Sequence, residues 1–394
     1  MENNNLNKGY LFIANGNKPT PDQAESIEPH TVGTFGIAPI EAASKMGYNI
    51  FIGINRNHPE QIKCTNFPQA ILYDQHCYRN IFDLKENYRA YKNLCKLLES
   101  HPEIEVIHCN TPIGGILGRL GGNKFNKKVI YTVHGFHFYK GAPFINRTVF
   151  KWIEEYLARY TNALITINKE DYETSKKMHF KKDGKSYYIP GVGVETNMFD
   201  SIIVDKKGKI QELGIPLDSS VGIVVGDLND NKNVETIIKA FPNTKNDFHL
   251  LVCGIGPNTN HLKELSQQLG IENRIHFLGF RKDIKELLSI SDLFLFASKR
   301  EGLSRSIMEA MCAGLPCVVS NIRGNVDLID DNNGGFVVSP KDVKGFANAI
   351  NRILSMEPSE RKGMGNYNKN KIKKFDINLV KQQMLEIYHE VLAE

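Results

Sequence analysis

Two glutamates, Glu301 and Glu309, frame the segment EGLSRSIME, whose residue types and spacing could do chemistry. The apolar run DLFLFA just before it predicts a short buried strand, and Gly302 marks the turn out of that strand. Ser304 is a suitable N-cap for a helix that ends near Gly314. Because the predicted helix is apolar around most of its circumference, we expect it to be buried.

Glu309 is the one acid of this helix, and a buried carboxylate without a polar partner is too costly to keep. At helical rise, the spacing from Glu301 to Glu309 corresponds to about 12 Å. Unpaired backbone N–H groups of the helix start lie between them, near Gly302, Leu303 and Ser304, and form a ready anion site. This arrangement fits a hexose, a pyrophosphate and a ribose in that order. A buried Glu309 paired with a Lys or Arg is an equally open alternative.

The pattern Glu-x7-Glu followed by Ala-Met-x-x-Gly-x-Pro resembles the donor-site motif of the family 4 glycosyltransferases, retaining enzymes of the GT-B fold. The resemblance continues in GDLNDNKN at residues 226–233, in SNIRGN at 320–325 and in VHGFHFYKGAP at 133–143. Together these motifs look like the branch that builds bacterial capsular and exopolysaccharides. The resemblance implies that Glu309 holds the ribose hydroxyls of the donor and that Glu301 contacts the transferred sugar.

Lys232 follows a predicted strand and stands at the start of a predicted helix, where a cation opposes the helix dipole. Such a cation is expected mainly where an anion binds, and the resemblance makes Lys232 the pyrophosphate lysine. The alternative is a solvent-exposed side chain in an Asn-rich turn. Many family members carry Arg directly after the Gly that ends this strand, whereas this chain has Asp227. Arg305, at another helix start, is a possible substitute for that cation, and an ordinary surface Arg is equally open.

His134 closes the predicted strand at residues 128–133, at the end where parallel-sheet proteins place their ligands. The resemblance implies that His134 faces the reacting sugar near its anomeric carbon. The alternative is a histidine that caps the strand through a backbone hydrogen bond. His137 forms a His-x-x-His pair with it, but a strand-to-loop turn lacks helical geometry and a third ligand, so we expect no metal site.

Three further residues are assigned to the donor. Gly33, in the segment TVGTFG, precedes an apolar helix, so the backbone there could approach a phosphate or a sugar; a plain helix-entry turn is equally open. The loop before it, residues 15–30, is unusually long for the family and matches it poorly. The resemblance implies that Phe280 and Arg281 border the base of the nucleotide.

Strand-like and helix-like runs alternate along the chain, which predicts an α/β protein with parallel sheets. The predicted strands cover residues 9–14, 48–54, 106–109, 128–133, 163–167, 187–189, 221–225, 249–253, 275–278, 292–296 and 317–319. The predicted helices cover residues 35–46, 86–99, 112–120, 146–160, 169–177, 234–241, 260–269, 284–289, 306–313 and 377–392.

Two such series indicate two Rossmann-like domains, residues 1–195 and 196–376, joined at the Gly-rich segment PGVGVETN. The GT-B resemblance implies that the two parallel sheets face each other across a cleft. It makes residues 1–195 the acceptor-side domain and residues 196–376 the nucleotide-sugar donor domain. It also implies that a last helix, within residues 377–394, packs back on the first domain. The Lys-rich stretch at residues 368–374 is interpreted as a link before that helix.

Composition excludes several classes of protein. With 394 residues, 41% hydrophobic and 24% charged, the chain has an ordinary globular composition and the length of two domains. It has neither a signal-peptide pattern nor an apolar stretch approaching the ~20 residues that span a bilayer, so we expect a cytoplasmic protein. The net charge of +5 and the single Trp do not indicate nucleic-acid binding. Seven cysteines without Cys-x-x-Cys spacing indicate buried thiols, not a zinc or disulfide framework.

We therefore expect a glycosyltransferase that moves a hexose or N-acetylhexosamine from a nucleotide sugar, UDP by resemblance, to a saccharide or polyprenyl-diphosphate-linked saccharide. The lack of an Asp-x-Asp motif predicts that it needs no metal or other cofactor. The helix around residues 144–157 is interpreted as a core helix, whose basic edge at Lys140, Arg147 and Lys151 could contact an anionic membrane or a lipid-linked acceptor. A sugar-nucleotide epimerase of the same fold and a non-catalytic nucleotide-sugar-binding protein remain alternatives.

Overall fold

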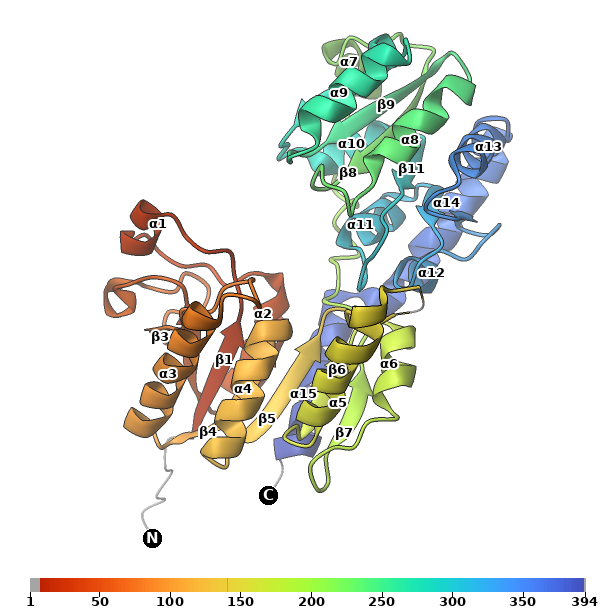
Figure 1. Cartoon of the computed structure of the whole chain (residues 1–394). Coiled ribbons are helices and arrows are strands. Elements are labelled where there is room, and N and C mark those ends of the chain that lie inside the picture. The colour runs from red at the N-terminus through yellow and green to blue at the C-terminus, as the bar shows by residue number, and fades with distance from the viewer. Residues whose placement is uncertain (1–7, 140, 393–394) are drawn as a thin grey trace. The chain divides into compact units, whose positions relative to one another are not determined.

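The structure is a computed structural model that describes residues 8–139 and 141–392. Lys140, part of the predicted basic edge, lies outside the described residues. The chain folds into two units (Figure 1). Unit 1 runs up to Val192 and resumes at Asn378, and unit 2 comprises Gly193–Ile377. From the sequence, the division was expected between residues 195 and 196, with the final helix returning to the first domain.

The described part of unit 1 is built on one parallel sheet with the strand order β3-β2-β1-β4-β5-β6-β7. Its strands are β1 (Gly9–Ala14), β2 (Asn49–Ile54), β3 (Ile71–Asp74), β4 (Ile104–Asn110), β5 (Lys128–Val133), β6 (Ala163–Thr166) and β7 (Lys185–Tyr188). Its helices are α1 (Pro21–Glu25), α2 (Thr34–Lys45), α3 (Leu84–Ser100), α4 (Pro112–Lys124), α5 (Lys151–Ala158), α6 (Lys169–Ser175) and α15 (Ile377–Leu392), with the short turns η1 (Pro59–Gln61) and η2 (Asn146–Phe150).

The described part of unit 2 also forms one parallel sheet, in the order β10-β9-β8-β11-β12-β13. Its strands are β8 (Ser220–Val225), β9 (Phe248–Cys253), β10 (Ile275–Gly279), β11 (Leu293–Phe296), β12 (Cys317–Ser320) and β13 (Gly335–Val338). Its helices are α7 (Lys206–Glu212), α8 (Val234–Ala240), α9 (Thr259–Gln268), α10 (Ile284–Ile290), α11 (Arg305–Ala313), α12 (Asn325–Leu328), α13 (Val343–Leu354) and α14 (Pro358–Ile372), with the short turns η3 (Phe241–Asn243), η4 (Glu272–Arg274) and η5 (Lys373–Phe375).

The core of unit 2 lies on both faces of its sheet, because alternate residues of each strand point to opposite faces. On β11, Leu293 and Leu295 join the hydrophobic cluster under α8 and α13, whereas Phe294 and Phe296 join the cluster under α10 and α11. Because both faces of this sheet are buried, the sequences of its strands are nearly continuous apolar runs. The expected α/β class with two Rossmann-like parallel-sheet units is confirmed.

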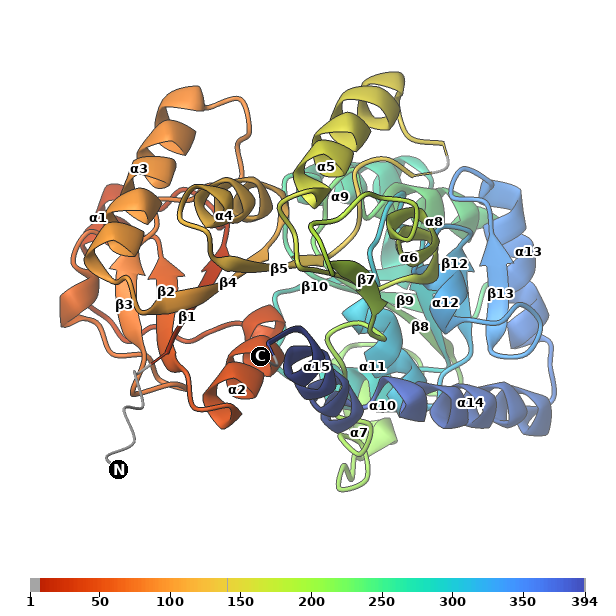
Figure 2. The ribbon, with the colours of Figure 1, turned by 90° about the horizontal axis from the view of Figure 1, so that it is seen from below.

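The final helix, α15, is anchored in unit 1 by buried polar contacts. The hydroxyl of Tyr388 lies 2.7 Å from the hydroxyl of Tyr10 and 2.5 Å from Nδ1 of His108. Lys381 of α15 also donates to Glu41 of α2 at 2.9 Å, and Figure 2 shows these two helices side by side. Burial of these hydroxyls makes their hydrogen bonds costly to lose.

Two expectations about local structure are wrong. The Lys-rich stretch at residues 368–374 is not a link, because it forms the end of α14 and the turn η5. The helix around residues 144–157 is not simply a core helix: α5 buries Leu157 and Ala158, but the side chains of Val149 and Trp152 are exposed. Its first turn, η2, is a π-helical turn.

Candidate functional site

In unit 2 the candidate site lies where the strand order reverses, between β8 and β11. In open parallel sheets, ligands bind beyond the carboxyl ends of the strands at this reversal. The loop after β8 supplies Lys232 and the loop after β11 supplies Glu301. The two side chains meet there, with Nζ of Lys232 at 2.8 Å from Oε1 of Glu301. The fold thus brings together two residues that lie far apart in the sequence.

Further contacts fix the positions of this pair. The hydroxyl of Ser298 donates to the same Glu301 oxygen at 2.5 Å, and Nζ of Lys232 lies 4.9 Å above the ring of Phe296. Asn233, which precedes α8, donates to the backbone oxygen of Ala297 at 2.9 Å and so ties the two loops together. The Lys232 ammonium has three donors, so its bond to Glu301 leaves capacity for an anionic ligand.

The helix predicted after Gly302 is α11, and it begins and ends as the sequence indicated. Its N-cap is Ser304, whose hydroxyl accepts from the backbone N–H of Ile307 at 3.5 Å. It ends at Gly314, which has the left-handed backbone with φ of 78° that favours glycine. Beside the helix start, Gly302 is in backbone contact with Gly324, where a Cβ atom would lie 2.3 Å from the Gly302 oxygen.

Glu309 has the polar partner that was expected for a largely buried carboxylate. Nε of Arg305 donates to Oε1 of Glu309 at 2.9 Å, one helical turn apart, and the Glu309 side chain is 19% exposed. Arg305 therefore occupies the first turn of α11 as predicted, but in this structure it faces Glu309. The i, i+4 spacing of the two residues was a signal for this pair in the sequence.

Phe280 and Arg281 follow β10, at the same edge of the sheet as the Lys232 loop. Phe280 is largely exposed, as a side chain that borders a ligand can be. Arg281 is engaged through two hydrogen bonds to Asp283, at 2.7 and 2.5 Å, and this contact lowers the pKa of the Asp283 carboxyl. Asp227, the departure from the family motif, is exposed after β8.

His134 belongs to unit 1, directly after β5. Its Nε2 lies 3.1 Å from Oδ1 of Asn110, and its ring packs against Phe35 with centroids 4.4 Å apart. Asn110 uses its amide nitrogen to donate to the Phe35 backbone at 3.3 Å, so its oxygen faces His134 and Nε2 carries the proton. Among the described residues, the buried Nδ1 has no hydrogen-bond partner. Burial lowers the pKa of His134 to about 4, so the ring is neutral at pH 7.

Sequence reasoning missed Asn110, although its position at the end of the buried strand β4 was the available signal. Gly33 also belongs to unit 1, where it is the N-cap of α2 and lines a pocket. The fold thus brings Lys232 and Glu301 into contact in unit 2, while His134 and Gly33 belong to unit 1. The assigned roles of these residues stay predictions.

Clusters of side chains that could hold a metal ion and membrane-spanning helices are both absent from residues 8–139 and 141–392. No group of three His, Cys, Asp or Glu side chains in these ranges is arranged to hold a metal ion. No helix within the same ranges is both long and apolar enough to cross a bilayer.

The chain matches two family models. The model described as "Glycosyl transferases group 1" matches residues 205–371, and that described as "Glycosyltransferase Family 4" matches residues 55–191. These matches fall on unit 2 and unit 1 respectively.

Two curated relatives and a solved structure are similar over most of their lengths. EpsD of Bacillus subtilis (strain 168), whose name describes a glycosyltransferase, is 32% identical over 79% of this chain and 82% of its own. The UDP-Gal:alpha-D-GlcNAc-diphosphoundecaprenol alpha-1,3-galactosyltransferase of Escherichia coli is 34% identical over 70% of this chain and 72% of its own. The crystal structure of Anabaena HepE in complex with UDP-glucose has a TM-score of 0.74 at 19% identity, covering 96% of this chain and 98% of that one.

Proposed function

Because this chain belongs to the family 4 glycosyltransferases, we propose that it transfers a hexose or N-acetylhexosamine from a UDP-linked donor to a saccharide acceptor, with retention. The observation that carries this proposal is the contact between Lys232 and Glu301 at the strand-order reversal of unit 2. That edge is where an open parallel sheet binds a nucleotide. Synthesis of a cell-surface polysaccharide is the process that the family resemblance indicates.

The choice of substrates is supported by the relatives. The Escherichia coli relative carries UDP-galactose and a diphosphoundecaprenol-linked sugar in its name. The Anabaena structure, which shares the fold of this chain, contains UDP-glucose. We therefore assign a UDP-sugar as the donor and a lipid-linked saccharide as the acceptor of this chain.

The leaving UDP develops negative charge on its diphosphate, and the proposed site meets that charge without a metal ion. Lys232 supplies the cation, and the backbone N–H groups at the start of α11 supply the donors. Glu309 would accept hydrogen bonds from the ribose hydroxyls, and Glu301 would contact the hydroxyls of the transferred sugar. Ser298 and Lys232 hold the Glu301 carboxylate in place for that contact.

His134 contributes a neutral imidazole from unit 1. Its Nε2 proton is directed at Asn110, so its unpartnered Nδ1 is a hydrogen-bond acceptor suited to a sugar hydroxyl. A pKa of about 4 means that His134 does not act as a cation at neutral pH. Its proposed role is to orient a sugar near the reacting carbon.

Peripheral contact with an anionic membrane is part of the proposal. Ile145, Val149, Trp152 and Tyr156 recur at helical spacing on one face around η2 and α5, and all four are exposed. Arg159 and Lys177 line a small hollow beside Trp152 and Tyr156. Aromatic and aliphatic side chains flanked by cations match the boundary between lipid headgroups and acyl chains. A lipid-linked acceptor on the cytoplasmic face of the membrane would be within reach of such a surface.

A thermal-shift screen with UDP-, GDP- and dTDP-linked sugars tests the donor assignment, because a ligand that binds the native state raises the melting temperature. We expect UDP-sugars to raise it most and radiolabelled sugar to pass from the best donor to a lipid-linked saccharide. Equal shifts with all three bases would contradict the assignment. Conversion of UDP-GlcNAc without an acceptor would indicate an epimerase instead.

A further inference from the structure

The motif SNIRGN, residues 320–325, lies beside the candidate donor site but has no part in the proposed function. It begins at the end of β12, and β12 pairs with β11. The loop after β12 therefore neighbours the loop after β11, residues 297–304, which carries Glu301. Ser320 and Asn325 of the motif are fully buried, so their polar groups must find partners within the protein.

The loop after β12 supports the loop after β11 through a short chain of buried hydrogen bonds. The hydroxyl of Ser320 donates to the backbone oxygen of Ser298 at 2.6 Å, and the amide of Asn325 donates to the Ser320 hydroxyl at 3.0 Å. The same amide donates to the Ser320 backbone oxygen at 3.2 Å and so fixes the turn after β12. Because Ser298 is fully buried as well, water cannot replace a partner that this chain loses.

Further contacts hold the backbone around Glu301 from both sides. Nε of Arg323 donates to the Glu301 backbone oxygen at 3.4 Å. From the loop after β8, the backbone oxygen of Asn231 accepts from the N–H of Lys299 at 2.8 Å, and its side-chain amide donates to the Arg300 oxygen at 3.0 Å. Since β11 pairs with both β8 and β12, the loop that carries Glu301 is fixed between two neighbouring loops.

Ser298 connects this support to the Glu301 carboxylate. The Ser298 hydroxyl and Nζ of Lys232 both donate to Oε1 of Glu301, at 2.5 and 2.8 Å. In the part of the chain that the structure describes, Oε2 of Glu301 accepts no hydrogen bond and is not closed off from solvent. A carboxylate has about four acceptor positions, so Oε2 keeps its capacity for a ligand.

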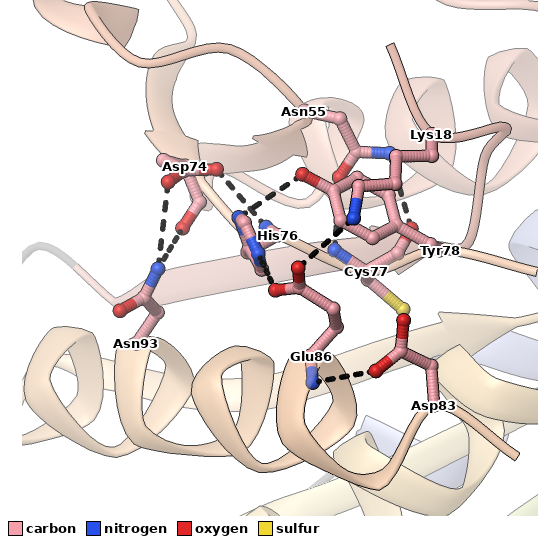
Figure 3. Close-up of polar contacts among 9 residues, drawn as sticks. All are labelled: Lys18, Asn55, Asp74, His76, Cys77, Tyr78, Asp83, Glu86 and Asn93. Carbon is pink, nitrogen blue, oxygen red and sulfur yellow. Dashed lines mark hydrogen bonds and ion pairs between the residues drawn. The ribbon is translucent and has the colours of Figure 1, made fainter. Parts of the chain in front are cut away.

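The carboxylate of Glu86 in unit 1 shows the contrasting arrangement. Figure 3 shows Lys18 and His76 pointing at Glu86, with Lys18 at 3.0 Å from Oε1 and His76 at 2.5 Å from Oε2. The hydrogen bonds from His76 and Lys18 lower the pKa of Glu86 to about 2. Glu86 thus has one donor on each oxygen, whereas Glu301 has both donors on the same oxygen. The arrangement around Glu301 leaves one oxygen for an outside donor.

We propose that Ser298 and Ser320 are positioning residues that present Oε2 of Glu301 to a hydroxyl of the transferred sugar. This inference rests on the proposed transferase function, and it adds the oxygen that contacts the sugar and the residues that orient it. When the donor diphosphate draws on Lys232, the Ser298 hydroxyl keeps Oε1 bound, so the carboxylate does not rotate. Ser320 touches no ligand and acts through Ser298.

Two alanine variants remove successive parts of this support. Ser298→Ala removes the hydroxyl bound to Oε1 of Glu301, and Ser320→Ala removes the donor to the Ser298 backbone. Neither variant introduces a larger side chain, so neither overfills the core. Ser266→Ala is the matched control, because Ser266 is buried in α9 and its hydroxyl donates only within its own helix, to the Lys263 oxygen at 2.7 Å.

Calorimetry measures the affinities for UDP and for UDP-glucose, UDP-galactose and UDP-GlcNAc, and initial rates of transfer to a diphosphoundecaprenol-linked saccharide give kcat and KM. We expect Ser298→Ala to weaken binding of the preferred UDP-sugar about fivefold and to lower kcat about tenfold, while UDP affinity stays within about twofold of the parent. Ser320→Ala should show the same difference between UDP-sugar and UDP, with smaller effects. Ser266→Ala should match the parent throughout.

Equal weakening of UDP and UDP-sugar binding in Ser298→Ala would indicate a general loss of structure at the site and would overturn the inference. Parental UDP-sugar affinity and kcat in both folded alanine variants would overturn it as well. Failure of the proposed function is distinguishable from both results, because the parent protein itself would then neither bind UDP-sugars nor transfer sugar.

Discussion

Nζ of Lys232 lies 2.8 Å from Oε1 of Glu301, at the point where the strand order of the second sheet reverses. The two side chains are each more than three-quarters buried, so solvent screens their interaction only in part. The pair joins a cation suited to a diphosphate with a carboxylate suited to sugar hydroxyls. This contact is the strongest structural support for a nucleotide-sugar site in unit 2.

Replacing Lys232 by Met should weaken UDP-sugar binding about tenfold to a hundredfold. A hydrogen bond to a charged partner contributes roughly 1.5–3 kcal/mol, and the substitution also leaves Glu301 without its cation. Isothermal calorimetry checks this prediction. Lys239→Met is the matched control, because Lys239 pairs with Glu235 on the outer part of α8 and should leave binding unchanged. Equal affinities of the two variants would argue against Lys232 as the phosphate ligand.

Sugar transfer should not need a divalent ion. Lys232 and the amides at the start of α11 are proposed to neutralise the leaving diphosphate, the work that a metal ion does in metal-dependent enzymes. We expect the initial rate to be the same in EDTA and in buffer with manganese or magnesium. Activity that disappears in EDTA and returns with manganese would contradict this prediction.

The exposed apolar face around η2 and α5 should bind anionic membranes. Vesicles of phosphatidylglycerol should retain the protein at low salt and release much of it at high salt, because the electrostatic part of the attraction is screened. Trp152→Ser should weaken retention, whereas Phe82→Ser, at another exposed aromatic position of unit 1, should not. Equal binding to phosphatidylcholine and phosphatidylglycerol would rule out recognition of lipid charge.

Acid should destabilise unit 1 through its buried histidines. Burial, with a smaller effect of His134, lowers the pKa of His108 to about 3. The unfolded chain, with a histidine pKa near 6.5, then binds a proton that the folded protein does not, so stability is lost as the pH falls from about 6.5 toward 3. His108 alone should cost about 2 kcal/mol between pH 7 and pH 5. Urea unfolding at the two pH values measures this, and a folded His108→Gln variant should show a smaller drop. A parent protein equally stable at both pH values would contradict the prediction.

The central strands and α11 could be predicted because the apolar pattern of their sequences indicates that they are buried. Strands covered on both faces become apolar runs, and α11 has both a capping Ser304 and a terminating Gly314. The short strands β3 and β13 were missed. Both lie at sheet edges, where one side lacks a neighbouring strand and the pattern is weaker.

Helix α14 was missed for a different reason. Its sequence, PSERKGMGNYNKNKI, has two glycines and a weak apolar face. Its position depends on distant contacts: Asn368 donates to the backbone oxygens of Leu315 at 2.8 Å and Gly334 at 2.7 Å. Gly365 also lies against the backbone of Gly314, closer than a side chain would allow. The helix propensity of a segment gives no information about contacts with residues that are distant in the sequence.

The candidate site was predictable in part. Motif spacing indicated Lys232, Glu301 and Glu309, but the contact between Lys232 and Glu301 depends on β8 and β11 becoming neighbouring strands. The pocket that Gly33 lines could not be predicted, because it is bordered by an irregular segment within residues 16–30. Arg56, just after β2, holds that segment through backbone oxygens. Side-chain contacts of this kind have no periodic signature.

The most direct test of the proposed site compares UDP affinity and transfer rate in two variants, Glu309→Gln and His134→Ala. Glu309 is proposed to accept charge-assisted hydrogen bonds from the ribose, each contributing roughly 1.5–3 kcal/mol, so Glu309→Gln should lose UDP affinity by calorimetry. His134→Ala should keep near-parental UDP affinity and transfer sugar slowly, because its contacts are made near the bond that breaks. If both folded variants bind UDP and transfer sugar like the parent, the site is not where we describe it.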